Sequence, residues 1–129
     1  MLSVLDTSIL IAEAPARVAG EIAISIVSVA ELQFGVLVAR DDQGRARRLA
    51  RLSAILRRFE PLPVDASVAA SYGELAAATH RAGRKGTSRS LDLMIAATAH
   101  AHGARLVTAN SDEVSHLANL IEIVQARGA

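Results

Sequence analysis

The segment Ser-Leu-Asp-Leu-Met-Ile-Ala-Ala-Thr-Ala, from Ser90 to Ala99, constrains the fold more than any other part of the chain. It predicts a helix that is apolar on every side, and such a helix belongs in a protein core. Its one carboxylate, Asp92, loses hydration there and needs a cation, N–H donors or a place at the helix end. Two explanations stay open. Either Asp92 interacts with the helix dipole in a first turn capped by Ser88 or Ser90, or it belongs to a cluster of acids.

Composition limits the chemistry that is available. The 129 residues are 51% hydrophobic, include no cysteine and have a mean hydropathy of +0.31. These values predict one compact domain over residues 1–129, and they exclude disulfides and thiolate metal sites. Any metal must therefore be bound by oxygen or imidazole ligands. No signal-peptide pattern or uncharged span of membrane length is found in the sequence, so we expect a cytoplasmic protein that does not contact a membrane.

The net charge is only +1, but the basic residues are unevenly distributed. Seven arginines fall in one segment: Arg40, Arg45, Arg47, Arg48, Arg51, Arg57 and Arg58. Arginine suits phosphate because its planar fork donates two hydrogen bonds at once. Three roles stay open: contact with an RNA backbone, a solvated helix face that pairs with Asp41 and Asp42, or docking of a protein partner. With two phenylalanines, one tyrosine and no tryptophan, base stacking cannot be the main mode of RNA recognition.

Short apolar segments alternate with helical patterns along the chain. We expect strands at residues 2–5, 21–25, 105–108 and 120–124, with at most an edge strand at 61–64 because of its prolines. We expect helices at residues 8–15, from 28, from 41 to the prolines at 61 and 63, at 65–83 and 90–103, and a short one at 114–117. This alternation predicts an α/β fold, a three-layer α/β/α sandwich with a mainly parallel central sheet.

Acidic and polar residues follow the predicted strands. Asp6 comes directly after the first strand, Glu31 early in the helix after the second, and Asn110 and Asp112 after the third. In open parallel sheets, sites form at the carboxyl ends of the strands, and the start of the helix that carries Asp92 can reach the same edge. Four carboxylates in one cleft require raised pKa values or a cation. Oxygen ligands favour Mg²⁺ or Mn²⁺.

A local explanation also exists for Glu31. The sequence Ser28-Val29-Ala30-Glu31 before an apolar run fits the capping-box pattern, with Ser28 as the N-cap and Glu31 as its partner. On local grounds this structural role is favoured. One carboxylate cannot fully serve both a cap and a metal, so the two roles of Glu31 remain alternatives.

These residues resemble the PIN domain family, in particular the VapC-type ribonuclease toxins. The resemblance covers essentially the whole chain. It rests on four segments in order: Leu5 to Ser8, Ser28 to Leu32 with Gly35, Asp92 to Ala99, and Leu106 to Asn110. Each segment is weak alone, but their order and spacing together are specific.

The resemblance implies a metal-dependent endoribonuclease. The matches are Asp6, Glu31 and Asp92 as three acids, Ser8 as support for the first, Thr108 and Asn110 as the last motif, and Asp112 as the fourth acid, with Glu113 as the adjacent alternative. It implies Mg²⁺ (or Mn²⁺) bound mainly by Asp6 and Asp92, with Glu31 and Asp112 acting through water.

The resemblance also implies partners: an RNA substrate, a cognate VapB-like antitoxin that blocks the cleft, and a second copy of the chain in a homodimer. The alternative is a catalytically silent protein of the same fold that binds a protein or RNA through the acidic cleft. A metal titration separates the two. None of the four histidines has a spacing typical of metal ligands, so we predict no role for His80, His100, His102 or His116.

Overall fold

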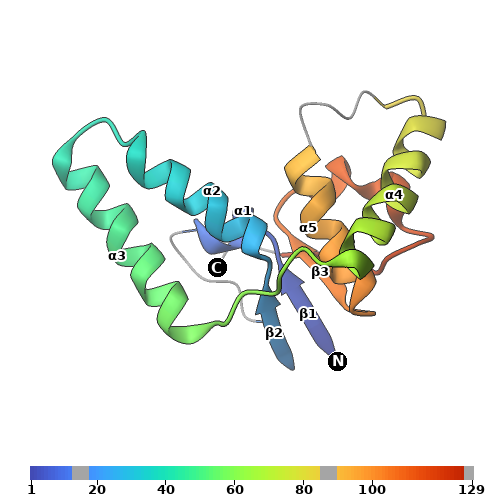
Figure 1. The fold of residues 1–129 in the computed structure, drawn as a ribbon, viewed down its shortest axis with the longest axis horizontal. Coiled ribbons are helices and arrows are strands. Elements are labelled where there is room, and N and C mark those ends of the chain that lie inside the picture. The colour runs from blue at the N-terminus through green and yellow to red at the C-terminus, as the bar shows by residue number, and fades with distance from the viewer. Residues whose placement is uncertain (13–17, 85–89, 127–129) are drawn as a thin grey trace.

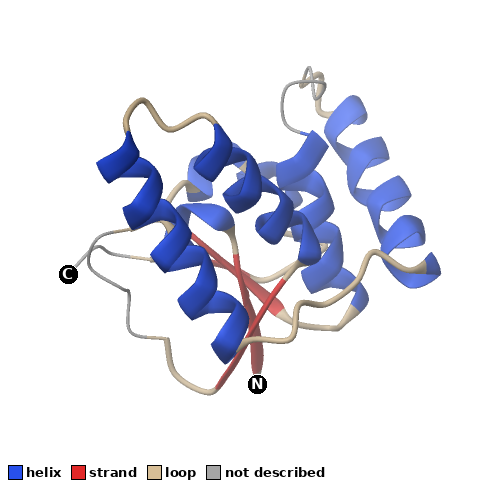
Figure 2. Ribbon diagram, turned by 60° about the vertical axis from the view of Figure 1, so that its left-hand side comes forward, coloured by secondary structure: helices blue, strands red, loops and turns tan. Residues whose placement is uncertain are grey.

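A four-stranded parallel sheet with the strand order β2-β1-β3-β4 forms the centre of the computed structural model (Figures 1 and 2). The structure describes residues 1–12, 18–84 and 90–126. The strands are β1 (Leu2–Leu5), β2 (Glu21–Ile24), β3 (Arg105–Thr108) and β4 (Ile123–Gln125). The helices are α1 (Thr7–Leu10), α2 (Ile26–Leu37), α3 (Asp42–Arg58), α4 (Ala66–Arg81) and α5 (Ser90–Ala101). The predicted α/β architecture with a parallel sheet is confirmed.

The two faces of the sheet carry separate hydrophobic clusters. Neighbouring residues of a strand point to opposite faces. Val4 and Leu106 accordingly pack with α4 and α5, whereas Leu5 and Val107 pack with residues of α1, α2 and α3. Figure 1 shows α4 and α5 side by side on one side of the sheet and the hairpin of α2 and α3 on the other. This arrangement makes the three layers.

Helix α5 is the buried helix that its apolar sequence predicts. Six of its residues are buried: Leu93, Ile95, Ala96, Ala97, Thr98 and Ala99. The alanines allow α4 and the sheet to approach closely on several sides. The helix ends before Gly103, which has a φ of 60°, and the Ala104 N–H donates to the Ala99 carbonyl at 2.9 Å. Glycine adopts this left-handed conformation without the steric cost that a Cβ adds.

Helix α2 begins earlier than the capping-box pattern predicts. Ser25 is the N-cap, and its hydroxyl accepts from the Val27 N–H at 3.0 Å. The prediction that Ser28 caps the helix is therefore wrong, and Glu31 lies in the second turn. The chain turns at Ser25 because β2 ends there. The Ile26 N–H donates a hydrogen bond to the Leu62 carbonyl at 2.9 Å.

Other boundaries also differ from the sequence prediction. The expected edge strand at 61–64 is reduced to a single bridge between Leu62 and Ser25. The last strand is β4 at Ile123–Gln125 rather than at 120–124, because two 3₁₀ turns, Ser111–Glu113 and Ser115–Leu117, occupy the chain before it. Pro15, Ser88 and positions 85–89 of the predicted basic loop lie outside the described residues.

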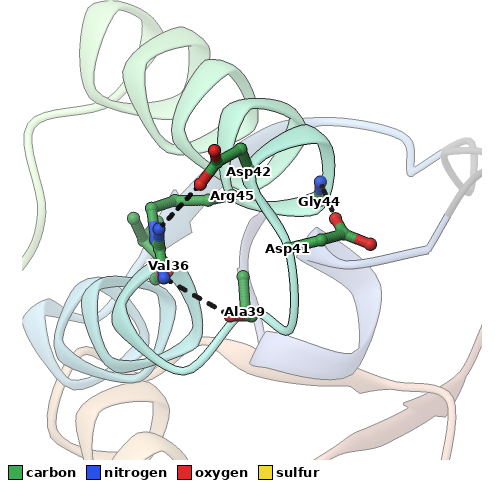
Figure 3. A network of polar contacts seen from close by, with 6 residues as sticks. All are labelled: Val36, Ala39, Asp41, Asp42, Gly44 and Arg45. Atoms are coloured by element: carbon green, nitrogen blue, oxygen red, sulfur yellow. Dashed lines mark hydrogen bonds and ion pairs between the residues drawn. The ribbon is translucent and has the colours of Figure 1, made fainter.

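The hairpin of α2 and α3 is joined by polar contacts (Figure 3). Asp41 caps α3 by accepting from the Gly44 N–H at 2.6 Å. Arg45 lies 3.4 Å from the carbonyl oxygens of Val36 and Ala39 and 3.4 Å from Asp42 Oδ1. These contacts turn Arg45 toward α2 at the corner of the hairpin.

Helix α3 contributes little to the core. The sequence predicts one inner apolar face for this helix, with Leu49, Leu52, Ile55, Leu56 and Phe59. Leu52 is buried, but Leu49 and Leu56 are exposed, so the prediction is wrong for these two residues. The contacts of α3 with other elements are mainly with α2. Of the helices described, none has the length and apolarity that a bilayer crossing requires.

Candidate active site

A cavity of about 290 Å³ opens at the carboxyl ends of β1 and β3. Its lining comprises Asp6, Ser8, Thr79, Arg84, Asp92, Leu93, Leu106, Thr108, Asn110, Glu113, Val114 and His116. Five of the predicted site residues are thus brought together: Asp6, Ser8, Asp92, Thr108 and Asn110. The parallel strands cause this, since loops that leave neighbouring strands meet at the same edge of the sheet.

Asp6 is held by its own turn. It is the N-cap of α1, and its Oδ1 accepts from both the Ser8 N–H, at 3.0 Å, and the Ser8 hydroxyl. The Ser8 hydroxyl oxygen in turn accepts from the Ala109 N–H at 3.0 Å. Ser8 therefore links the acid after β1 to the chain that leaves β3. Among the described residues, these contacts use Oδ1 of Asp6 and leave Oδ2 for a ligand.

Asp92 reaches the same cavity from α5. It is the third residue of the helix and side-chain exposed, while the next residue, Leu93, is buried in the core. Ser90 is the first residue of α5 and not its N-cap. The first turn places Asp92 near the positive end of the helix dipole, which favours an ionised carboxylate. Both features considered for Asp92, the helix-end position and the shared acidic cavity, therefore occur together.

Glu31 lies in a different hollow. Its Oε1 accepts from the Thr7 hydroxyl at 2.6 Å, and the same hydroxyl lies 3.0 Å from the Ser28 hydroxyl. A groove of about 620 Å³ between α2 and α3 is lined by Glu31 and Thr7 together with Arg48, Arg51 and Leu91. Since Thr7 follows Asp6 and Leu91 precedes Asp92, the groove and the cavity are neighbours. Thr7 was not predicted as a site residue, although it lies between Asp6 and Ser8, which were.

Of the two candidates for the fourth acid, Glu113 lines the cavity and Asp112 does not. Both residues belong to the 3₁₀ turn Ser111–Glu113. Thr108 fixes the start of this segment, since its hydroxyl accepts from the Asn110 N–H at 3.0 Å.

Thr79 and His116 form a second polar pair in the cavity wall. The Thr79 hydroxyl donates to the Leu75 carbonyl at 2.8 Å and lies 2.8 Å from His116 Nε2. A hydroxyl has one proton, so Nε2–H is assigned as the donor to Thr79, which makes Nδ1 the acceptor nitrogen. Nδ1 is buried and has no hydrogen-bond partner among the described residues. Burial, and then the charge of Arg84, lowers the pKa of His116 and favours its neutral form.

The cavity suits a hydrated divalent ion better than a closed metal cage. Across residues 1–12, 18–84 and 90–126, no three acidic or histidine side chains are close enough to enclose one ion. Asp6, Asp92 and Glu113 nevertheless line one cavity, together with Thr108 and Asn110. Mg²⁺ typically keeps several waters and binds through one or two carboxylates and substrate phosphates. The donor set fits that kind of site.

Comparisons with known proteins agree with this architecture. A PIN domain model matches residues 3–120. The ribonuclease VapC4 of Mycobacterium tuberculosis is 37% identical over 99 residues, which are 76% of this chain and 74% of that protein. The ribonuclease VapC5 of the same organism is 36% identical over 115 residues, with 84% and 83% covered.

Solved structures give the same result. The toxin–antitoxin structure VapBC-5 from M. tuberculosis superposes with a TM-score of 0.83 at 34% identity, covering 96% of this chain and 98% of that one. VapBC2 from Rickettsia felis, bound to a promoter DNA fragment, gives a TM-score of 0.74 at 29% identity and covers 97% and 98%. The fold of this chain is thus shared with these proteins. The chain belongs to the PIN domain family, and its relatives place it among the VapC-type toxins.

Proposed function

We propose that this protein is a metal-dependent endoribonuclease that hydrolyses RNA phosphodiester bonds as the toxin of a toxin–antitoxin pair. The observation that carries the proposal is the cavity in which Asp6, Asp92 and Glu113 converge from three elements of the fold. The ribonuclease names of the relatives support the same chemistry. No observation favours the alternative of a catalytically silent binding protein.

Each residue of the cavity has a separate role in this proposal. Asp6, through Oδ2, and Asp92 would hold Mg²⁺ or Mn²⁺, and Glu113 would act through water. The bound ion would supply a water of lowered pKa and positive charge for the phosphate. Ser8 keeps the Asp6 carboxylate in one orientation. The Asn110 side chain, which lines the cavity, can donate a hydrogen bond to a phosphate oxygen.

Glu31 is not a direct ligand in this proposal. Its carboxylate is bonded to the Thr7 hydroxyl and lies in the neighbouring groove. It therefore fixes the turn that carries Asp6. Carboxylates and hydroxyls that support a ligand in this way commonly affect metal affinity.

The substitution Asp92→Asn tests the proposal, because it keeps the shape of the side chain and removes its charge. We expect RNA cleavage to fall at least about 100-fold, with the unfolding free energy changed by about 1 kcal/mol or less. Cleavage of a labelled RNA at several Mg²⁺ concentrations and denaturant unfolding measure the two effects. Glu122→Gln is the control, because it also removes an exposed acid but one that lies outside the cavity. Full activity of Asp92→Asn would refute the catalytic assignment.

An antitoxin partner and a homodimer are part of the proposal. The related structures are toxin–antitoxin complexes. Beside the groove of Glu31, Phe34 is 66% exposed and Leu91 54%, and the adjacent Leu37 is 74% exposed. Exposed apolar groups of this size are typical of surfaces that bind another protein. Light scattering of the chain, alone and with a co-expressed VapB-like antitoxin, measures both associations. A cytoplasmic location is part of the same proposal, because that is where cellular RNA substrates are found.

A further inference from the structure

We propose that Arg84 binds a phosphate of the substrate RNA in the acid-lined cavity. This inference rests on the proposed function, since it assigns a residue to the binding of that substrate. None of the arginines between positions 40 and 58 lines this cavity, although that segment carries half of the lysines and arginines of the chain.

The backbone fixes the position of Arg84. Helix α4 ends at Arg81, and Gly83, with a φ of 73°, reverses the chain. The Arg84 N–H then donates to the Thr79 carbonyl at 3.2 Å. A left-handed residue just after a helix closes its last turn in this way. The residue that follows the glycine is thereby held against the end of α4.

The side chain of Arg84 crosses to the opposite segment of the cavity wall. Its Nη1 donates to the carbonyl oxygen of Glu113 at 3.1 Å. A guanidinium carries five N–H donors in a planar fork, and this contact uses one of them. Arg84 is otherwise exposed, so the remaining donors are accessible from the cavity. A planar fork of this kind binds phosphate oxygens in pairs.

The cavity offers a cation beside its acids. Among the described residues that line it, Arg84 is the only permanent cation, beside Asp6, Asp92 and Glu113. A phosphate that enters adds negative charge, which a guanidinium in the cavity wall attracts. The charge of Arg84 already reaches into the cavity wall, because it contributes to the lowered pKa of His116.

The arginines of α3 have other contacts. Arg45 lies against the carbonyls of Val36 and Ala39, and Arg48 donates from Nη1 to the Gly35 carbonyl at 2.5 Å. Both side chains therefore join α3 to α2. Contact with RNA is expected at the cavity rather than along that helix.

The test compares Arg84→Gln with Arg81→Gln. Arg81 is an exposed arginine of the same helix end, and it lies beside Ala70, Gly73 and Leu120 instead of the cavity. Binding of a single-stranded RNA oligonucleotide is measured by fluorescence anisotropy in Ca²⁺, an oxygen-binding ion that replaces Mg²⁺ to allow binding without turnover. The measurement is repeated over a range of salt concentrations.

For Arg84→Gln we expect an RNA Kd about tenfold higher at low salt, the size of a lost charge-assisted hydrogen bond. The slope of log affinity against log salt should fall by about 0.7, the value for one phosphate contact on a single strand. In Mg²⁺, KM should rise more than kcat falls. Arg84→Lys should keep the salt slope and lose part of the affinity. Arg81→Gln should match the wild type in each measurement.

Two results overturn the inference and are distinguishable. If the wild type binds RNA and Arg84→Gln keeps its salt slope but loses thermal stability, Arg84 only supports the Glu113 turn. If Arg84→Gln binds RNA as the wild type does, Arg84 does not contact phosphate, and the proposed nuclease function still stands. A wild type that neither binds nor cleaves RNA refutes the proposed function itself, and this inference with it.

Discussion

Helices α5 and α3 differ in how they are held in the molecule. In α5 six of 12 residues are buried, between α4 and the sheet. In α3, with 17 residues, Leu52 is the buried one, and Arg45 and Arg48 add contacts to carbonyls of α2. The acids of the cavity lie after β1, in the turn that follows β3, and at the start of α5. The site is thus built on the more buried half of the fold, while the α2–α3 hairpin carries exposed apolar groups suited to a partner.

The largest expected effect is a difference in unfolding free energy between a substitution in α5 and one in α3. Ile95 in α5 is 0% exposed, so Ile95→Ala leaves a cavity and should lower the unfolding free energy by about 2–5 kcal/mol. Leu56 in α3 is 43% exposed, and Leu56→Ala should cost less than about 1 kcal/mol. Urea unfolding followed by circular dichroism measures both. Equal losses would show that α3 is as firmly packed as α5.

A smaller effect is expected on the pH dependence of stability, through the pair of Thr79 and His116 on the α4–α5 side. The pKa of His116 is lowered in the folded protein, so below its ordinary value of 6.5 the unfolded chain binds more protons than the folded one. The stability that neutral His116 contributes is fully present above pH 6.5. It is lost as the pH falls from 6.5 through the lower pKa of His116 in the folded state.

Unfolding free energies between pH 7.5 and 5 measure this loss. His116→Gln should show a weaker decline toward low pH than the wild type. The exposed His102 offers a matched control, and His102→Gln should follow the wild-type curve. A decline unchanged by His116→Gln would assign the acid sensitivity to other groups.

The smallest expected effect is on the α3 side. Arg47 is exposed on α3 and does not line the cavity, and Arg51 lines only the groove of Glu31 and a second hollow beside Phe59. Replacing both arginines by glutamate should leave the salt slope of RNA binding unchanged, because neither contacts phosphate. Anisotropy in Ca²⁺ measures the slope, and antitoxin binding is measured in parallel. A flatter slope in the double variant would restore an RNA-tracking role for α3.

Patterns that depend on burial were predictable from sequence. A decapeptide apolar on all sides has to be buried, and residues that follow parallel strands have to meet at one edge, so the burial of α5 and the position of Asp6 were predictable. Asp92 itself is exposed at the start of the helix, contrary to the expected loss of hydration. Helix α4 begins after its N-cap Asp65 and ends before Gly83, as these residue types predict.

Choices between neighbouring residues of similar chemistry were not predictable. Ser25 and Ser28 are equally good caps, and the bond that the Ile26 N–H donates to the Leu62 carbonyl favours Ser25. Asp112 and Glu113 are adjacent acids, and only the tertiary structure shows that Glu113 lines the cavity. The contacts of Arg84 with Glu113 and of Thr79 with His116 join positions 29 and 37 residues apart, which no local pattern encodes.

The pairing of β1 with β3 has a consequence for biosynthesis. The Asp6 N–H donates to the Val107 carbonyl at 3.0 Å, and the Ser8 hydroxyl meets the Ala109 N–H across 101 positions of sequence. A nascent chain leaves the ribosome N-terminus first, so Asp6 emerges well before strand β3, to which it is hydrogen-bonded in the fold. The cavity is complete only after its last lining residue, His116, has emerged. Until then, a chain that cuts RNA would be inert toward the messenger and the ribosome that produce it.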